Sequence, residues 1–471
     1  MTRWARPGGI TGTGTPSALV REICASGLNV QRGEVLVPTL LGDELSEPIS
    51  CAAAPLVAGS LQRKGRHVRL APAPRYADAG NDGDAVLYLA TCPQPGGATT
   101  AIAAAAPRGD RLSAAVAMAA VEEWAAVAGS RVVLAAGSPW CSGAVRAAET
   151  YRRAAAEHAG RERAIRVLGP LSVPPEAAAE LDMLGVVHLT SLADTEEGDV
   201  VLFPAHGVSS QVRAEAAERG LVVIDATCPL VARAQEAAGR LAARGQHVVL
   251  IGQSRAAAAT PIASRATGQV TIVENTGGTT TLNVTDAQRI TYMLQPGLPV
   301  EAASSVIGAL RSRYPAAQGT PPAGLCYAPS DRLATIRAVA TGSDLVLVLG
   351  DPRSGDTRQV VAQARDAGAR VQPIGTVFEL EPAMIDGVTT VGIIESTSAH
   401  SGLAAQVIAA VGGLGELNVA RRQVRTEPPA LEDRECGAHR RPRASAVPEY
   451  HPASAVAQAG LSGTRLAGTA T

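Results

Sequence analysis

The sequence has no long hydrophobic run and no strong net charge, and both absences exclude whole classes of protein. No stretch of about 18 apolar residues occurs, so no membrane-spanning helix is predicted; the most apolar segment, SAAVAMAAVEEWAAVAG, is interrupted by Glu122 and Glu123. The N-terminal segment MTRWARPGGITGTGTPSALVREI lacks the apolar core of a secretory signal. The formal net charge of −1 gives no global field that would attract nucleic acid or anionic lipid. We therefore expect a cytoplasmic protein that binds neither membranes nor nucleic acid.

Cysteine and lysine are both scarce. The seven cysteines are an odd number spread over 471 residues, which argues against a disulfide framework and for reduced thiols or metal ligation. Among the 42 basic residues only Lys64 is a lysine. GC-biased codon usage explains this imbalance most simply, so the abundance of arginine carries no functional information.

The first 130 residues predict an N-terminal α/β extension of unknown role. Strand-like apolar runs occur in GEVLVPTL, HVRLA and DAVLYLA, with helical patterns between and after them. Cys24, Cys51 and Cys92 lie here without the spacing of metal ligands, which favours a structural or incidental role. The region has no phosphate loop, metal-ligand cluster or nucleophile motif, so a separate activity carried by it is the least favoured interpretation.

From residue 131 the chain alternates strand-like and helical patterns with short turns, which is typical of parallel α/β units. We expect three units, 131–224, 225–322 and 323–416, that each carry one cysteine and are related by pseudo-threefold symmetry. Residues 417–471 are rich in Arg, Pro, Ala, Gly and Thr without periodicity, which predicts a disordered tail. Cys436 in this tail is interpreted as a bystander.

Three cysteines occupy matching positions in these units. Cys141, Cys228 and Cys326 each follow a predicted strand and open a predicted helix, in the settings GSPWCSGAVRA, VIDATCPLVARA and GLCYAPSDR. Thiols from three successive units can meet only at a shared centre. Three thiolates on a four-iron cluster leave one iron without a protein ligand, free to bind substrate. The alternative is three ordinary buried cysteines, which the matching settings disfavour.

Polar residues recur at the ends of neighbouring strands. His206 follows VVLFPA, Gln295 closes TYML, Ser354 lies in GDPRSGDT, and Ser398 lies in ESTSAHS. A single serine or histidine at the start of a helix is usually a cap. In open α/β units, however, ligands bind beyond the carboxyl ends of the strands. Recurrence at this level therefore predicts a shared polar pocket.

Residues 131 to about 415 resemble the 4-hydroxy-3-methylbut-2-enyl diphosphate reductases, the final enzymes of the non-mevalonate isoprenoid pathway. The resemblance lies in WCSGAVRA, in the continuous stretch FPAHGVSSQVRAEAAERGLVVIDATCPLV, and in LCYAPSDR. It implies three α/β units around a central [4Fe-4S] cluster, with Cys141, Cys228 and Cys326 as its ligands. The implied activity is an iron–sulfur oxidoreductase that dehydroxylates an allylic alcohol diphosphate to isopentenyl and dimethylallyl diphosphate. A one-electron donor such as ferredoxin or flavodoxin is the implied partner.

The resemblance also assigns substrate-binding positions. His206, Ser354 and Ser398 fall on residues that bind the diphosphate in this family, and Gln295 falls on the glutamine beside an active-site threonine. The chain departs from the family elsewhere. A second histidine expected between 159 and 187 is absent, which removes one phosphate donor.

The family's His-Pro-Glu motif is missing. Ala256, Ala257 and Ala258 stand in its place, and Ala258 occupies the position of the acid that relays protons to the leaving hydroxyl. No catalytic acid is therefore predicted from the resemblance. Loss of a general acid typically costs about 10² to 10⁴ in rate.

Three further substitutions affect the polar pocket. Two active-site threonines of the family are replaced by Pro296 and Pro329, and the phosphate-binding asparagine is replaced by Asp356. An aspartate facing a diphosphate repels it unless the carboxyl is protonated or paired. We expect one of three arginines to compensate through bidentate contacts: Arg255, Arg353 or Arg358.

Two interpretations of function follow. The first is a reductase of this family, acting on the usual diphosphate or, through a related reaction, on another oxygenated substrate. The second is a non-catalytic paralogue in which the cluster is structural or senses redox state or iron. Retention of all three cysteines and of the segment AHGVS favours the first.

Overall fold

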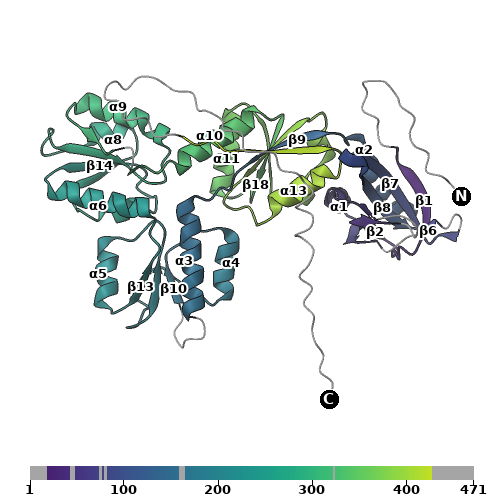
Figure 1. The fold of residues 1–471 in the computed structure, drawn as a ribbon, viewed down its shortest axis with the longest axis horizontal. Helices are drawn as coiled ribbons and strands as arrows, with labels where there is room; N and C mark the ends of the chain where they lie inside the picture. The colour runs from purple at the N-terminus through teal and green to yellow at the C-terminus, as the bar shows by residue number, and fades with distance from the viewer. Residues whose placement is uncertain are drawn as a thin grey trace, which may run out of the picture.

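The computed structural model describes residues 19–42, 48–73, 77–78, 82–158, 165–321 and 324–426, which form four β-sheets with their helices. In Figure 1 the N-terminal sheet lies at one end of an elongated molecule, and the three α/β units make up the rest. Within the described ranges no helix is both long and apolar enough to cross a membrane.

The N-terminal region is one mixed, eight-stranded sheet with two α-helices. Its strands are β1 (Arg21–Ser26), β2 (Glu34–Pro38), β3 (Leu40–Leu41), β4 (Ile49–Ser50), β5 (His67–Ala71), β6 (Ala77–Asp78), β7 (Ala85–Pro93) and β8 (Thr99–Pro107). Its helices are α1 (Ala54–Arg63), the short η2 (Pro95–Gly97) and α2 (Arg111–Ala126). The predicted α/β character is confirmed, and the three apolar runs form β2, β5 and β7. The longest pairing, β7 with β8, is an antiparallel hairpin that the alanine-rich sequence of β8 does not suggest.

Three parallel sheets follow, and each organises one unit. The first unit contains α3 (Ser142–His158), β10 (Ile165–Leu168), α4 (Pro175–Met183), β11 (Val187–Leu189), β12 (Val200–Phe203), α5 (Ser210–Glu218) and β13 (Val222–Asp225). The second contains α6 (Pro229–Ala243), β14 (His247–Ile251), α7 (Ala259–Ala263), β15 (Val270–Val273), α8 (Thr276–Thr281), β16 (Ile290–Leu294), η3 (Val300–Ala303), α9 (Ser304–Arg313) and β17 (Gln318–Gly319).

The third unit is assembled from both ends of the region. It contains β9 (Arg131–Ala136), α10 (Ala328–Thr341), β18 (Leu345–Leu349), α11 (Gly355–Asp366), β19 (Arg370–Ile374), η5 (Val377–Glu379), α12 (Pro382–Ile385), β20 (Thr390–Glu395), α13 (Leu403–Gly412) and β21 (Leu417–Arg422). The strand orders are β11-β10-β12-β13, β15-β14-β16-β17 and β19-β18-β20-β9-β21. The first three strands follow the same order in every sheet, as expected for three related α/β units, whereas the fourth position of the third sheet is taken by β9, which precedes the other strands of that sheet in the chain.

The pattern of apolar residues explains these elements. Strand β18 has the sequence LVLVL with all five residues buried, as expected for a parallel strand covered on both faces. Helix α6 buries Val231, Ala234, Ala238 and Ala242, which recur every three or four residues and form one apolar face. Small alanines on that face let helices pack close to the sheets.

Two predicted boundaries are wrong, at the two ends of the reductase-like region. Strand β9 was expected in the first unit, but it pairs in parallel with β20, with Val133 opposite Val391, and so belongs to the third. The predicted tail contains strand β21, which pairs with β9. Apolar patterns reveal that a strand exists but not its partner, which tertiary packing selects. The remainder of the expected tail, residues 427–471 with Cys436, lies outside the described residues.

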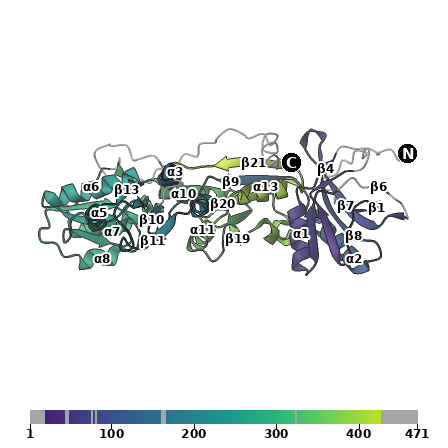
Figure 2. The same ribbon diagram turned by 90° about the horizontal axis from the view of Figure 1, so that it is seen from below.

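The N-terminal region packs directly onto the third unit, as Figure 2 also shows. Buried residues of α1, β7, β8, β18 and α13 belong to one continuous hydrophobic core. A side chain at Gly59 of α1 would collide with the carbonyl of Phe378, and one at Gly413 would collide with the backbone of Ala53. Arg63 donates a hydrogen bond of 2.9 Å to the carbonyl of Leu380. The region is therefore fixed on one unit through backbone-to-backbone contact.

The two most buried cysteines of the N-terminal region are poorly reactive. Burial raises the pKa of Cys51 to about 12 and that of Cys92 to about 11. A thiol that stays protonated at neutral pH is a poor nucleophile and a poor metal ligand. This environment agrees with the structural role predicted for these cysteines.

Candidate active site

The three cysteines of the reductase-like region lie at the starts of three helices. Cys141 directly precedes α3, Cys228 is the N-cap residue of α6, and Cys326 lies two residues before α10. Each follows a strand, β9, β13 and β17 respectively, so the predicted strand-to-helix settings are confirmed. The free N–H groups at a helix start stabilise nearby negative charge, and all three cysteines occupy such a position.

Gly143 marks the place where two of the thiols meet. A Cβ atom at this glycine would lie 2.9 Å from Sγ of Cys228 and 3.6 Å from Sγ of Cys141. The backbone of α3 therefore approaches both sulfur atoms, and the absence of a side chain leaves the space between them open. Cys141 is exposed and Cys228 half-buried, so this space is accessible.

The third thiol interacts electrostatically with the other two. Burial raises the pKa of Cys326, and the neighbouring Cys141 and Cys228 thiols raise it further, whereas hydrogen bonds from backbone N–H groups oppose the shift. Cysteines separated by most of the reductase-like region thus lie close enough for their charges to interact. The structure brings the three predicted ligands to one place.

The arrangement of the three thiols is compatible with an iron–sulfur cluster. Among the described residues no three His, Cys, Asp or Glu side chains are grouped tightly enough to hold one metal ion. In an iron–sulfur cluster each cysteine binds a different iron, so the sulfur atoms need not converge on one point. Two thiols beside the open space at Gly143, with a third close enough to interact with both, fit such a group.

A polar edge is formed by the loops that follow β18 and β20. The hydroxyls of Thr357, Ser396 and Ser398, here called the hydroxyl cluster, hydrogen-bond with one another at 2.8 to 3.0 Å. Ser398 also accepts a hydrogen bond of 3.0 Å from the N–H of Asp351. A side chain at Gly350 would collide with Ser396 and Ser398, so the cluster requires a glycine here. Ser398 was predicted, whereas Thr357 and Ser396 were missed.

Ser354 differs from Ser398 because its hydroxyl does not cap the helix that it precedes, whereas the Ser398 hydroxyl is hydrogen-bonded to its neighbours. It is the N-cap residue of the 12-residue helix α11, yet its side chain makes no capping hydrogen bond. The first N–H groups of a helix normally need such a partner or a ligand. Ser354 and the start of α11 together offer hydrogen-bond donors to an anion.

Asp356 is paired, but with none of the three expected arginines. Its Oδ2 accepts hydrogen bonds of 2.9 Å from Arg332 and of 2.7 Å from the N–H of Thr397. Burial alone would raise the pKa of Asp356, but these hydrogen bonds and the charge of Arg332 outweigh it and lower the pKa. Arg332 lies on α10 and so comes from the segment that follows Cys326.

The expected arginine partners bind elsewhere. Arg353 pairs with Asp351 at 3.3 Å, and Arg358 donates a 2.6 Å hydrogen bond to the carbonyl of Arg353. Arg255 interacts electrostatically with Glu274. Proximity in sequence suggested these residues, whereas the folded loops bring in Arg332 instead.

His206 and Gln295 occupy different environments. The Nδ1 atom of His206 is buried and has no hydrogen-bond partner, and burial lowers the pKa of its imidazole. Gln295 is only 5% exposed, and its Oε1 accepts a hydrogen bond of 2.8 Å from the N–H of Gln253. The Nδ1 atom of His206 is therefore unused by the described residues, whereas the amide oxygen of Gln295 already holds the loop at Gln253.

Ala258 provides no acid and no cap. It is the N-cap residue of α7 and makes no side-chain hydrogen bond, and it is 7% exposed. A methyl group buried at this position cannot transfer a proton.

A profile of the LytB protein family matches residues 132–412. The 4-hydroxy-3-methylbut-2-enyl diphosphate reductase 2 of Mycobacterium bovis is 34% identical over 300 residues, which cover 63% of this chain and 90% of the relative. The corresponding reductase of Stenotrophomonas maltophilia is 33% identical over 300 residues, which cover 61% of this chain and 92% of the relative.

A solved structure is similar to the same region. The E-1-hydroxy-2-methyl-but-2-enyl-4-diphosphate reductase from Plasmodium falciparum matches with a TM-score of 0.55 and 21% sequence identity, over 64% of this chain and 96% of that protein. At this identity the match supports the three-unit fold and nothing finer. The family match begins at residue 132, so it does not include the N-terminal sheet.

Proposed function

The chain belongs to the LytB protein family, and from this premise we propose that it is an iron–sulfur reductase that removes the hydroxyl group of an allylic alcohol diphosphate. The products would be isopentenyl and dimethylallyl diphosphate. The observation that carries the proposal is that the Cys141 and Cys228 thiols lie together beside Gly143 and that Cys326 is close enough to interact electrostatically with both. The named relatives with this family's sequence are diphosphate reductases.

The thiols of Cys141, Cys228 and Cys326 would hold a [4Fe-4S] cluster. When bound, such a cluster supplies one-electron transfer and a Lewis-acidic iron. A one-electron donor of the ferredoxin or flavodoxin type would deliver the two electrons.

The anionic part of the substrate would bind at the polar edge. Ser354 offers a hydroxyl without a capping hydrogen bond, next to the start of α11. Arg332 uses one nitrogen to bind Asp356 and makes no other hydrogen bond among the described residues, so most of its five donors are available. His206 would add its unpartnered nitrogen. Asp356 reduces the positive charge here, because its carboxylate is already bound to the guanidinium.

The alternative is a paralogue without catalysis, in which a cluster is structural or senses redox state or iron. Two observations favour it: Ala258 supplies no acid, and the amide oxygen of Gln295 is committed to the backbone of Gln253. A related reaction on another oxygenated substrate would also accommodate these changes.

The test is an anaerobic assay of the cluster-containing protein with 4-hydroxy-3-methylbut-2-enyl diphosphate and a strong one-electron donor such as dithionite-reduced methyl viologen. We expect substrate-dependent oxidation of the donor, with isopentenyl and dimethylallyl diphosphate detected by mass spectrometry. The Cys326→Ser protein controls for background oxidation. A protein that is fully loaded with cluster and reducible, yet forms neither product, would favour the paralogue.

A further inference from the structure

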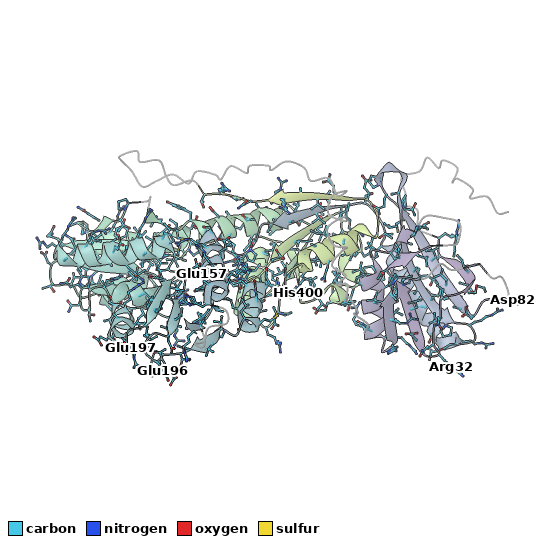
Figure 3. All side chains as sticks on the ribbon, turned by 60° about the horizontal axis from the view of Figure 1, so that its bottom comes forward. Arg32, Asp82, Glu157, Glu196, Glu197 and His400 are labelled. Carbon is cyan, nitrogen blue, oxygen red and sulfur yellow. The ribbon has the colours of Figure 1, made fainter. Side chains whose placement is uncertain are left out.

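A small cavity of about 230 Å³ lies between the first and third units. Three segments form it: the loop 138–140 before α3, Glu176 of α4, and residues 395–402 between β20 and α13. Figure 3 shows His400, one of the lining residues, in the middle of the molecule and well away from Arg32 and Asp82 of the N-terminal region. The cavity therefore belongs to the three-unit part of the chain.

The cavity borders both halves of the candidate active site. Trp140 lines it and is directly followed by Cys141. Ser396 also lines it, and this serine belongs to the hydroxyl cluster. A group in the cavity thus lies between the segment of the first thiol and the polar edge.

Three titratable side chains face the cavity, and they come from the elements packed around it. Glu395 stands at the end of β20, Glu176 lies in the first turn of α4, and His400 precedes α13. The loop 138–140 adds no titratable group, and no arginine or lysine from the described part of the chain lines the cavity. The charge balance of the cavity therefore depends on two carboxyls and one imidazole.

The carboxyls around the site differ in how readily they keep a proton. Burial raises the pKa of Glu395 above its ordinary 4.5, the Glu176 carboxylate raises it further, and His400 opposes the shift. Asp356 and Asp351 have lowered pKa values, because hydrogen bonds and arginines stabilise their charged forms. A carboxyl whose pKa is raised can hold a proton and donate it, whereas a carboxyl whose pKa is lowered stays ionised.

We propose that Glu395 is the proton donor to the departing oxygen of the substrate, and that Glu176 and the cavity connect it to solvent. This inference rests on the proposed function. In the reaction the allylic C–O bond breaks, the oxygen takes one proton from Glu395 and leaves as water, and a second proton from solvent completes the new C–H bond. The one-electron donor supplies both electrons. The Glu395 carboxylate then regains its proton from solvent.

The first test follows protonation of Glu395 without a cluster or substrate. Trp140 lines the same cavity, and its fluorescence is isolated by subtracting the spectrum of the Trp140→Phe protein. We expect a pH transition above 4.5 that disappears in Glu395→Gln and moves to lower pH in Glu176→Gln, since that change removes the neighbouring negative charge. The same transition in wild type and Glu395→Gln would overturn the inference, whatever the enzyme does.

The second test is the pH dependence of turnover in the cluster-containing protein. Protonated Glu395 becomes rarer as pH rises through its pKa, so wild-type kcat falls along that limb. Glu395→Gln should lower kcat by about 10² to 10⁴ and abolish this limb, with unchanged cluster content and reduced-cluster resonance. Glu395→Asp should recover part of the rate. Normal turnover by Glu395→Gln would overturn the inference but leave the proposed function standing.

The two tests separate the two claims. A fluorescence transition that depends on Glu395, together with no turnover by the loaded wild-type protein, would count against the proposed function and not against the protonation of Glu395. Turnover that is insensitive to Glu395 would count only against the inference.

Discussion

The thiol side and the polar side of the candidate site are built in different ways. On the thiol side, Cys141, Cys228 and Cys326 depend only on where three helices start and on the open space at Gly143. On the polar side, hydroxyls, carboxylates and one arginine hold one another in a network of hydrogen bonds. A cysteine that is positioned by the backbone keeps its place when neighbouring side chains are substituted. In a polar network, substitution of one side chain alters the hydrogen bonds of the others. This difference explains why the thiol side is easily recognised in the sequence and the polar side is not.

The largest expected effect concerns the thiol side. We expect Cys141→Ser, Cys228→Ser and Cys326→Ser each to lose most of the bound iron and sulfide, because each thiolate would hold a different iron of the cluster. The measurement is iron and sulfide content after anaerobic purification, with the visible absorption of the cluster as a second readout.

Cys24→Ser is the matched control, since Cys24 is a half-buried free cysteine in the N-terminal sheet. Its cluster content should equal that of the wild type. If one of the three serine variants kept a full cluster, the cysteine replaced in it would not be a ligand. The thiol side could then no longer be described as three cluster ligands placed by the starts of three helices.

A smaller effect is expected for Arg332 on the polar side. Arg332→Gln removes the guanidinium that pairs with Asp356 and leaves a carboxylate facing the anionic substrate. A hydrogen bond to a charged group contributes about 1.5 to 3 kcal/mol, so KM for the diphosphate should rise by about 10- to 100-fold. Steady-state kinetics with the diphosphate substrate measures this change.

Arg337→Gln on the same helix is the control, because Arg337 is exposed and should leave KM unchanged. Equal KM values for the two variants would mean that Arg332 only neutralises Asp356 and does not bind substrate. In that case the polar side would be a structural network rather than an anion site.

The sequence was sufficient to predict the central strands and helices that carry long apolar runs and the strand-to-helix settings of the three cysteines, but not the partners of the terminal strands. Apolar runs such as HVVLI and LVLVL are unambiguous in a parallel α/β fold, and β14 and β18 form there. The pairing of β9 with β20 and β21 joins residues more than 250 positions apart, and local pattern contains no information about such a contact. The hairpin partner β8 was missed for a related reason, because its alanines favour a helix as an isolated segment.

For the polar side, the sequence predicts where the polar residues lie but not which side chains they bind. Ser354 and Ser398 lie in loops beyond the carboxyl ends of strands, and Asp356 lies in the first turn of α11 at the same level, where the fold places ligand-binding residues. Which arginine reaches Asp356 depends on the side-chain conformation of Arg332 on another helix. The cavity around Glu395 is formed by two units, so no single stretch of sequence contains it.

The smallest expected effects come from two serines, and they sharpen the comparison within the polar side. Ser398→Ala removes the partner of the Asp351 N–H and of two other hydroxyls. Because an unsatisfied buried donor costs about 1 to 3 kcal/mol, the free energy of unfolding should fall by about this amount, which denaturant unfolding would detect.

Ser354→Ala removes a hydroxyl with no capping hydrogen bond, so the free energy of unfolding should change by less than about 0.5 kcal/mol. Its KM for the diphosphate should nevertheless rise by about 2- to 10-fold, as expected for one neutral hydrogen bond. A loss of stability in Ser354→Ala without a change in KM would show that Ser354 belongs to the structural network. A hydroxyl that binds only the ligand makes no hydrogen bond in the free protein, so its removal should not affect the free energy of unfolding.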